Sequence, residues 1–538
     1  MSPGRVFRYA PLPYRPVLPE MLRAVCEQHG GNDFVVASDS TGNDERISYG
    51  DADTRSADLA ARLLSCGVVK GNRVGILAPN GPDFAVGFLA ATRIGAVAVP
   101  LNTFFQAGEL EWLLRDSDIH TVVAVESLLG KDIRARLEAV TGTSATDGLR
   151  CARLPHLRNV IYFSPRQVSA QPEYRKLLTQ CEATVRETDD LMVIYTSGST
   201  AHPKGVIHTH GTAITHSAFI AGQHGWTSSD RVYVPMAFFW VGGLVFGLLG
   251  PMQLGLTILT EHRFDAGDVL RLLQSERATY TTGFDHIGPA LSNHPDFARA
   301  DLSALREGYQ QMLLPPRRRA ADPSLRVRQL GMTETCSSHT WWPPHEQVPE
   351  SKRGSLGVSG PGYEHKIVDD TGREVPHGTV GEICVRGWAM MRGIVGRSRQ
   401  EVFDADGWYH TKDAGYQDDD GHLYFTGRVD DMIKTSGANV APAEVEALLG
   451  RIEGVRVAYV VGLPDPEKGA LVCAVVVLDT GSDLTADQLT AECRQHLAAY
   501  KVPKRWVLLP DVDQLPYTTT DKIDKVALAK MLEAKVLA

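Results

Sequence analysis

Apolar helical segments and short β-branched runs alternate through the first half of this sequence. The run "ADLAARLLSCG" has the apolar spacing of a helix that ends at Gly67, and "RVGILAP" after it has the composition of a buried strand. A second pair, "DFAVGFLAATRIG" and "AVAVPL", repeats the order of helix and strand. Because such alternation is typical of parallel sheets, the sequence predicts an α/β fold.

The part of the chain after residue 350 has a different texture. From about Gly354 to Gly427, short strands with Asp-Thr-Gly and Asp-Gly turns predict a β-rich subdomain. Alternation then returns, from "PAEVEALLGRIEGV" to "RWVLLPD", and is sufficient for a small α+β domain. A chain of 538 residues exceeds what one core usually serves. We therefore predict a large N-terminal domain of several subdomains over 1–428 and a small C-terminal domain over 429–538, with the hinge in "GRVDDMIKTSG".

Charge and cysteine content exclude several classes of protein. The formal net charge of −9 argues against a nucleic-acid partner, since no basic excess is available to neutralise phosphates. The eight cysteines lack CxxC spacing, so the sequence suggests neither a disulfide framework nor a zinc site. The N-terminus has no signal-peptide pattern, and we expect a cytoplasmic protein.

One long stretch, from Val232 to Thr260, contains no charged residue and is long enough to cross a bilayer. Glycines and prolines, among them Pro235, Gly243 and Pro251, divide it into shorter pieces. These breaks favour a strand, a buried helix and a second strand over a transmembrane segment. Peripheral contact with a membrane stays open.

The segment "YTSGSTAHPKG", from Tyr195 to Gly205, has the composition of a loop that wraps an anionic oxygen. Small residues let backbone N–H groups approach the anion, and Lys204 supplies positive charge. It is not a Walker loop, because Pro203 stands where the second glycine is required and Gly205 where the hydroxyl is required. It follows the apolar run "LMVIY", which predicts a buried strand leading into a turn that holds a nucleotide's outer phosphates.

Further motifs follow this loop in a fixed order: "GMTE", "GWYHTKD", "GRVDDMIKTSGANVAPAEVE" and "KIDK". With them the chain resembles the adenylate-forming superfamily of acyl- and aryl-CoA synthetases, nonribosomal adenylation domains and luciferases, and most of all the acyl-CoA synthetases. The resemblance implies that a carboxylic acid attacks the α-phosphate of ATP with Mg²⁺, pyrophosphate leaves, and a thiol, usually that of coenzyme A, captures the acyl-adenylate. It also implies that the C-terminal domain is mobile.

The resemblance assigns roles in the adenylation step. The residues that would cradle the β- and γ-phosphates are Thr196, Ser197, Gly198, Ser199, Thr200 and Lys204. Thr333 would donate to the α-phosphate and Glu334 would hold Mg²⁺, a cation that prefers carboxylate and phosphate oxygens. Lys522 would bridge the carboxylate and the α-phosphate. The alternative for "MTET" is a capped helix start.

The resemblance also assigns roles in nucleotide binding and in the second step. Asp413 would accept both ribose hydroxyls, although it could instead be a turn residue. Arg428 resembles the arginine that contacts ribose and phosphate, and Asp430 the residue about which the small domain rotates. After rotation, Lys434 and Gly437 would face the active site and line a tunnel for the pantetheine arm.

The sequence departs from the family at several positions. Asp521 precedes Lys522 where relatives have glycine, and Lys412 replaces the glycine of "TGD". Leu330 stands where an aromatic residue commonly stacks on adenine. The turn "GYQQML" stands where the family has a small Gly-Gly-Ala turn, and the segment from it to "GMTE" is shortened, so Tyr309 or Gln310 would shape the pocket there.

The acyl-binding site is expected along "MAFFWVGG" and "TTGFDHIG". The pocket residues predicted from these segments and from the shortened turn are Phe239, Trp240, Gly243, Phe284 and Tyr309. Their apolar character predicts a fatty or aromatic acid as substrate. For any single aromatic residue, a role in the core is an equally good interpretation.

The sequence thus favours an ATP-dependent carboxylate–CoA ligase that needs ATP, Mg²⁺ and coenzyme A. One alternative within this chemistry is a ligase that passes the acyl group to an amine or to a carrier-protein thiol. An alternative of another class is a catalytically silent protein that binds a nucleotide or an acyl group.

Overall fold

The computed structural model describes the chain in segments. They are residues 12–39, 42–163, 172–196, 203–284, 287–319, 322, 325–342, 348–369, 371–428, 433–440, 442–516 and 523–534. The chain forms two compact units. The first comprises Met1–Thr103, Leu114–Tyr195 and Gly205–Gly427, and the second comprises Phe104–Leu113, Thr196–Lys204 and Arg428–Ala538, each as far as it is described. The predicted boundary between 428 and 429 stays a prediction.

A seven-stranded sheet has the order β21-β10-β9-β4-β3-β5-β8. Its strands are β3 (Arg73–Leu77), β4 (Val97–Pro100), β5 (Ile119–Ala124), β8 (Asn159–Tyr162), β9 (Asp190–Thr196), β10 (Lys204–Thr209) and β21 (Gly393–Ile394). β3 pairs in parallel with both β4 and β5, whereas β10 pairs antiparallel with the edge strand β21. The predicted strands "RVGILAP", "AVAVPL" and "LMVIY" are therefore confirmed.

A six-stranded sheet has the order β14-β13-β11-β12-β1-β2. Its strands are β1 (Asp33–Ser38), β2 (Asp44–Ser48), β11 (Arg231–Tyr233), β12 (Thr257–Glu261), β13 (Tyr280–Thr281) and β14 (Glu307–Gly308). All neighbours pair in parallel except β1 and β2. Helix α3 (Pro82–Arg93), buried along nearly its whole length, contacts strands of both large sheets, and this explains why its sequence is apolar all round.

Further α-helices precede, separate or follow these strands in sequence. They are α1 (Leu18–His29), α2 (Tyr49–Ser65), α4 (Ala107–Asp116), α5 (Ile133–Thr141), α6 (Pro172–Thr184), α7 (His210–Gln223), α9 (Ala266–Ser275), α10 (Ile287–Ser292) and α11 (Arg399–Val402). The α/β fold class predicted from the alternation is confirmed.

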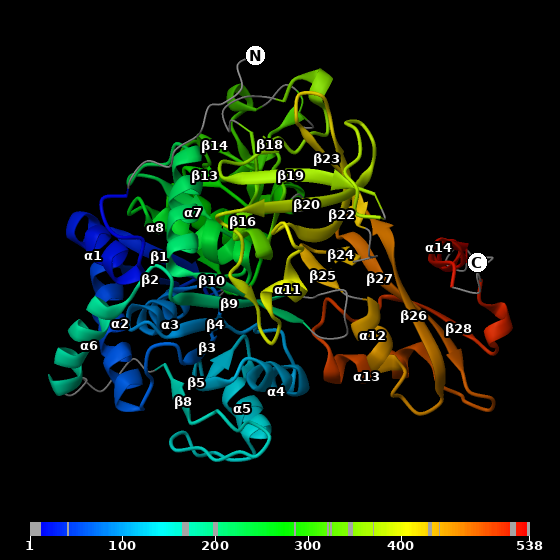
Figure 1. Cartoon of the computed structure of the whole chain (residues 1–538), viewed down its shortest axis with the longest axis horizontal. Helices are drawn as coiled ribbons and strands as arrows, with labels where there is room; N and C mark the ends of the chain where they lie inside the picture. Colours follow the sequence, from blue (N-terminus) through cyan, green and yellow to red (C-terminus); the bar gives the residue numbers. More distant parts are fainter. Residues whose placement is uncertain are drawn as a thin grey trace. The chain divides into compact units, whose positions relative to one another are not determined.

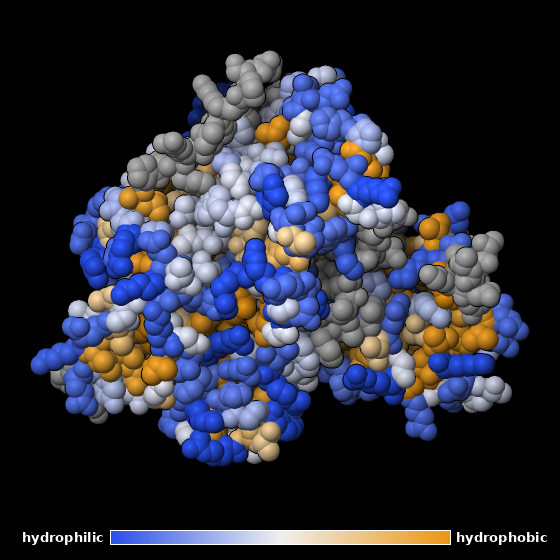
Figure 2. Space-filling view, in the orientation of Figure 1, coloured by the Kyte–Doolittle hydropathy of each residue, from blue (hydrophilic) through white to orange (hydrophobic). Residues whose placement is uncertain are grey.

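The uncharged stretch from Val232 to Thr260 forms the pieces that its glycines and prolines predict. Between β11 and β12 it contains a π-helix, η1 (Gly242–Leu249), and a single α-turn, α8 (Gly250–Met252). Gly247 allows a close approach, since a Cβ there would lie 2.4 Å from Val234 Cγ1. Among the described residues, no helix is long and apolar enough to cross a membrane. Figure 2 shows hydrophilic and hydrophobic residues interspersed on the visible face.

The β-rich subdomain is an antiparallel sheet of order β19-β20-β22-β23 (Figure 1). Its strands are β19 (Tyr363–Val368), β20 (Gly381–Gly387), β22 (Tyr409–Gln417) and β23 (Leu423–Arg428). The predicted turns fall between strands, with Gly372 and Gly421 in the left-handed conformation that glycine adopts most easily. Short strand pairs complete the first unit: β6 (Ser127–Leu128) with β7 (Lys131–Asp132), β15 (Gly331–Met332) with β16 (Ser337–Ser338), and β17 (Thr340–Trp341) with β18 (Val358–Ser359).

The second unit contains a three-stranded sheet of order β26-β27-β28. The helices and strands of this unit after residue 428 are β24 (Ile433–Thr435), β25 (Ala438–Val440), α12 (Pro442–Leu449), β26 (Val455–Asp465), β27 (Gly469–Leu478), α13 (Ala486–His496), β28 (Arg505–Leu509) and α14 (Lys525–Ala534). Alternate residues of β27 enter different cores: Val472 packs with residues of α12 and α13, and Cys473 packs with residues of α14. The predicted small α+β domain therefore has both sheet faces covered.

Candidate active site

Several residues predicted from the motifs lie outside the described residues. They are Ser197, Gly198, Ser199, Thr200, Asp430, Asp521 and Lys522. Arg428 is described only as the last residue of β23. Of the predicted phosphate loop, the structure therefore describes the two strands that flank it, β9 and β10.

The strands flanking this loop begin and end at predicted phosphate-binding residues. Thr196 is the last residue of β9, and its buried hydroxyl has no partner among the described residues. Lys204 is the first residue of β10. Gly205 follows, and a Cβ there would lie 2.8 Å from the Tyr195 ring and 3.0 Å from Val193 Cγ1. The glycine of "PKG" is thus required by close packing in the sheet.

The motif "GMTE" forms a single 3₁₀ turn at Thr333–Thr335, and not the start of a longer helix. Each of its three carbonyl oxygens accepts a hydrogen bond from a different element. His208 Nε2 lies 2.7 Å from the first, the backbone N–H of Met391 donates to the second at 2.8 Å, and the Tyr363 hydroxyl donates to the third. Hydrogen bonds from β10, β19 and the segment before β21 therefore hold the turn in place.

The Glu334 side chain, predicted to hold Mg²⁺, is 4% exposed. The Tyr409 hydroxyl donates to Glu334 Oε1 at 3.0 Å. A phenol that donates to one carboxylate oxygen orients the group and keeps it an acceptor. Carboxylate oxygen is the donor type that Mg²⁺ prefers, so the residue fits the ion that the motif implies.

His208 is a residue that the motif analysis missed. Burial lowers its pKa to about 4, so the ring is neutral near pH 7. Because Thr333 offers a carbonyl oxygen, the proton of the neutral ring must sit on Nε2. The signal in the sequence was weak, since "VIHTH" has no spacing that distinguishes it from an ordinary strand.

Asp413, predicted to bind ribose, lies in the interior of β22 and is 6% exposed. Its backbone N–H donates to Thr411 Oγ1 at 3.0 Å, and that hydroxyl donates to the carbonyl of Ile383 at 2.6 Å. Tyr409, Thr411 and Asp413 alternate with less buried residues and so share one face of the strand. One strand face thus carries both the ribose candidate and the partner of the Mg²⁺ candidate.

Lys412, which replaces a family glycine, adopts a left-handed backbone conformation with φ of +61°. Its backbone N–H donates to Glu382 Oε1 at 2.9 Å. The pairing of β20 with β22 shifts register between Glu382 and Cys384, so the strand bulges at this position. The departure from the family therefore places a lysine where glycine is easier to accommodate.

The predicted acyl-pocket residues follow strands that end at one edge of the six-stranded sheet. Because β11, β13 and β14 are adjacent and parallel, Phe239 and Trp240, Phe284, and Tyr309 all follow strand ends on the same side. The Phe239 and Trp240 rings lie 5.0 Å apart, and Gly243 lies in η1. The structure thus gathers segments that the sequence separates.

The shortened turn "GYQQML" is held by specific contacts. Gln310 is buried and its Nε2 donates to the carbonyl of Phe284 at 2.9 Å. The Arg326 guanidinium covers the Tyr309 ring at 4.2 Å from its centroid, and burial lowers the pKa of Arg326 to about 10. Gln310 therefore ties the turn to the segment that carries Phe284.

Asn80, in "LAPNGPDF", is a second residue that the motif analysis gave no role. Its Nδ2 donates to the carbonyl of Met236 at 2.9 Å and to Thr260 Oγ1 at 3.0 Å. Its Oδ1 accepts from the backbone N–H of Phe238 at 2.7 Å. Asn80 therefore positions the segment that carries Phe239 and Trp240.

In the second unit, Lys434 and Gly437 lie on the β24–β25 hairpin. Lys434 is exposed. Ser436 and Gly437 form its two-residue turn, both with positive φ, at 48° and 78°. The glycine thus serves a tight hairpin turn, and the lysine projects from the first strand of the hairpin.

These motifs and this fold identify a class of enzyme: the chain belongs to the AMP-binding enzyme family. It matches that family over residues 22–395, and it matches the AMP-binding enzyme C-terminal domain over residues 444–522. The resemblance to adenylate-forming enzymes is therefore confirmed.

Individual relatives are similar over nearly their whole length. The long-chain-fatty-acid–CoA ligase FadD13 of Mycobacterium tuberculosis is 30% identical, with 92% of this chain and 94% of the relative covered. The feruloyl-CoA synthase of Amycolatopsis sp is 33% identical, with 89% and 92% covered. The solved structure of the amide bond synthetase McbA from Marinactinospora thermotolerans is 26% identical and superposes with a TM-score of 0.75, with 95% and 99% covered.

Proposed function

We propose that this protein is an ATP-dependent acid–CoA ligase that forms an acyl-adenylate, releases pyrophosphate and transfers the acyl group to coenzyme A. The observation that carries the proposal is that strand β22 is linked to both candidate nucleotide-binding carboxylates. Tyr409 contacts Glu334, and Asp413 lies four residues further along the same face of β22. A carboxylate for Mg²⁺ and a carboxylate for ribose are what binding of Mg-ATP needs from this part of the chain.

In the proposed first step, an oxygen of the acid's carboxylate attacks the α-phosphorus of ATP. The bond from that phosphorus to the oxygen bridging the α- and β-phosphates breaks, and pyrophosphate carries away the electron pair. Lys204 would offset charge on the leaving phosphates, and Lys522 would offset charge between carboxylate and α-phosphate. Thr333 would donate to an α-phosphate oxygen, and Glu334 would hold the Mg²⁺ that neutralises phosphate charge.

In the proposed second step, the thiol of coenzyme A attacks the acyl carbonyl carbon and AMP leaves. Lys434 and Gly437 would line the path of the pantetheine arm after the C-terminal part has rotated about Asp430. This order uses one nucleotide site for both steps, since AMP stays bound by Asp413 until the thioester has formed.

The acid is proposed to be fatty or aromatic. Phe239, Trp240 and Phe284 bring apolar rings to one sheet edge, and Asn80 fixes the segment that carries two of them. A pocket lined by such rings binds an apolar tail and gives a charged side chain no partner. Of the relatives, FadD13 is a ligase of long-chain fatty acids and the feruloyl-CoA synthase is named for an aromatic acid.

A second candidate acceptor is an amine, because an amide bond synthetase is among the structures similar to this chain. The two acceptors differ in the second product: a thioester of coenzyme A or an amide. The test is to incubate the enzyme with ATP, Mg²⁺ and a panel of fatty and aromatic acids, with coenzyme A or with an amine. Formation of the thioester at the higher rate supports the proposal, whereas amide formation without thioester contradicts it.

A further inference from the structure

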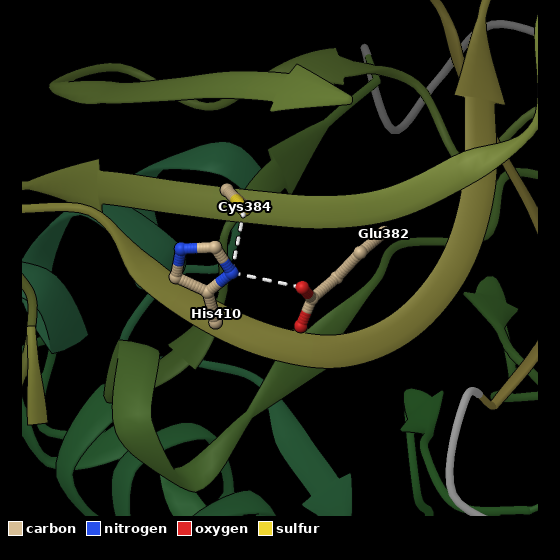
Figure 3. A group of neighbouring side chains, drawn as sticks. All are labelled: Glu382, Cys384 and His410. Carbon is tan, nitrogen blue, oxygen red and sulfur yellow. Dashed lines mark hydrogen bonds and ion pairs between the residues drawn. The ribbon is translucent and has the colours of Figure 1, made fainter. Parts of the chain in front are cut away.

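A group of three chemically different side chains lies on the other face of β20 and β22. Glu382 and Cys384 come from β20, and His410 comes from β22 (Figure 3). His410 Nδ1 lies 2.8 Å from Glu382 Oε2 and 3.5 Å from Cys384 Sγ. The carboxylate, the thiol and the imidazole nitrogen thus converge on one point.

Strand geometry explains why these residues meet. Glu382 and Cys384 are two residues apart and therefore share a face of β20, while Cys384 and His410 are direct partners across the strand pair. The register shift between Glu382 and Cys384 brings the carboxylate toward His410. The opposite face carries Ile383 and Thr411, so the group is separate from the nucleotide candidates.

We propose that Glu382, Cys384 and His410 bind one thiophilic divalent metal ion of the Zn²⁺ class. The ligands would be Cys384 Sγ, His410 Nδ1 and Glu382 Oε2, with water in a fourth position. With Zn–S near about 2.3 Å and Zn–N near about 2.0 Å, a tetrahedral site separates sulfur and nitrogen by about 3.5 Å. The observed separation of these two atoms is 3.5 Å, so the pair needs no rearrangement.

The third ligand lies within reach, since its oxygen, the sulfur and the nitrogen are all within 4.8 Å of one another. The 2.8 Å contact between His410 Nδ1 and Glu382 Oε2 is a hydrogen bond. A tetrahedral ion between nitrogen and oxygen spaces them by about 3.3 Å, so the bond must open by about 0.5 Å and lose its proton. Glu382 Oε1 keeps its bond from the Lys412 backbone N–H throughout.

The second nitrogen of His410 also has a suitable neighbour. Nε2 lies 3.7 Å from Asp404 Oδ2, and Lys366 Nζ lies 3.7 Å from the same carboxylate. A histidine that ligates a metal through one nitrogen commonly turns its other N–H toward a carboxylate. Once a metal takes Nδ1, the remaining proton of the ring is on Nε2, which faces the Asp404 carboxylate.

A nucleophilic role for Cys384 is the main alternative, and the geometry does not support it. In a catalytic triad the histidine uses different nitrogens for the nucleophile and for the carboxylate, whereas here both groups face Nδ1.

A second group of metal-ligand type, in the turn between β22 and β23, provides a comparison. Asp418, Asp420 and His422 also bring their ligand atoms together. There Lys352 Nζ donates to Asp418 at 2.8 Å and to Asp420 at 2.5 Å. Because the ammonium group already occupies the place of a cation, we assign no metal to this group.

The test is a titration of the full-length chain, without an affinity tag and freed of metal by chelator dialysis, with Co²⁺ and then Zn²⁺. We expect one Co²⁺ per chain with a sulfur-to-cobalt charge-transfer band, and displacement by Zn²⁺. Cys384→Ser should abolish the band, and His410→Gln should weaken binding roughly 100-fold. The matched control Cys473→Ser, which changes another fully buried strand cysteine, should leave both unchanged.

The folding of each variant is checked by circular dichroism and by its melting temperature without metal. A Co²⁺ spectrum without the sulfur band in the wild-type chain would overturn the proposal. So would an identical band in Cys384→Ser, because the thiolate would then come from another cysteine. This result is independent of ligase activity, since the readout is the metal spectrum.

Discussion

The Tyr409 hydroxyl donates to Glu334 Oε1 at 3.0 Å, and this bond joins strand β22 to the Thr333–Thr335 turn. The two groups come from segments far apart in the sequence, yet both are buried. The same strand presents Asp413 on the same face. This phenol therefore links the candidate Mg²⁺ carboxylate to the strand that carries the candidate ribose carboxylate.

Removing this hydroxyl in Tyr409→Phe should weaken the proposed Mg²⁺ site. A hydrogen bond to a charged group contributes about 1.5–3 kcal/mol, so adenylation should slow roughly tenfold or more and need more Mg²⁺. The measurement is the rate of adenylation as a function of Mg²⁺ concentration. The control is Tyr424→Phe, whose hydroxyl donates to Asp418 in the same sheet. An unchanged Mg²⁺ titration in Tyr409→Phe would contradict the assigned role.

Lys412→Gly should stabilise the protein. A residue with a side chain destabilises the fold by about 1–2 kcal/mol when its backbone is in the left-handed region. Glycine removes this strain, but part of the gain is lost because glycine has more conformational freedom in the unfolded chain. We expect a net gain of about 0.5–1 kcal/mol and a rise in melting temperature of roughly 1–2 °C. Lys412→Ala keeps the Cβ atom and should show no gain. A lower melting temperature for Lys412→Gly would rule out backbone strain at this position.

Buried histidines should make the first unit sensitive to acid. Burial lowers the pKa of His216 from 6.5 to about 3. As the pH falls, the unfolded chain therefore binds a proton at this histidine at a higher pH than the folded chain does. The free energy of unfolding that depends on neutral His216 is fully present above pH 6.5 and decreases below it. Between pH 7.5 and pH 5 this group alone removes about 2 kcal/mol.

The check is the free energy of unfolding across this pH range. His216→Leu should make the pH dependence less steep, whereas His156→Leu, at an exposed position, should not. Equal slopes for His216→Leu and the wild-type chain would show that His216 does not carry this share of the pH dependence.

Lys522→Ala should separate the two proposed half-reactions. If Lys522 acts only between the carboxylate and the α-phosphate, adenylation should fall roughly 100-fold or more, while thioester formation from supplied acyl-adenylate continues. The matched control is Lys525→Ala, three residues further on at the start of α14. Equal loss of both half-reactions in Lys522→Ala would contradict this division of roles.

The arrangement of strands and helices could be predicted well from local patterns. The alternation in the first half, the turns of the β-rich subdomain and the division of the uncharged stretch all depend on spacing along the chain, and the structure confirms them. Short-range geometry dictates these elements, because side-chain period and turn residues act within a few positions.

Partners across long sequence separations could not be predicted in this way. His208 supports Thr333 from 125 residues away, and Asn80 holds Phe238 from 158 residues away. The same reason explains why Cys384 was not recognised as a candidate metal ligand. A search for CxxC spacing cannot detect two candidate ligands that meet across two strands. Lys412 was recognised as a departure from the family, but its left-handed backbone became visible only in the structure.

Carboxylate-dependent exchange of labelled pyrophosphate into ATP, with Mg²⁺ and without coenzyme A, tests the central proposal most directly. We expect exchange with at least one fatty or aromatic acid, and its loss in Lys522→Ala. Folded protein that binds ATP but catalyses no exchange with any acid of the panel would contradict the proposed ligase function and favour a silent binding protein.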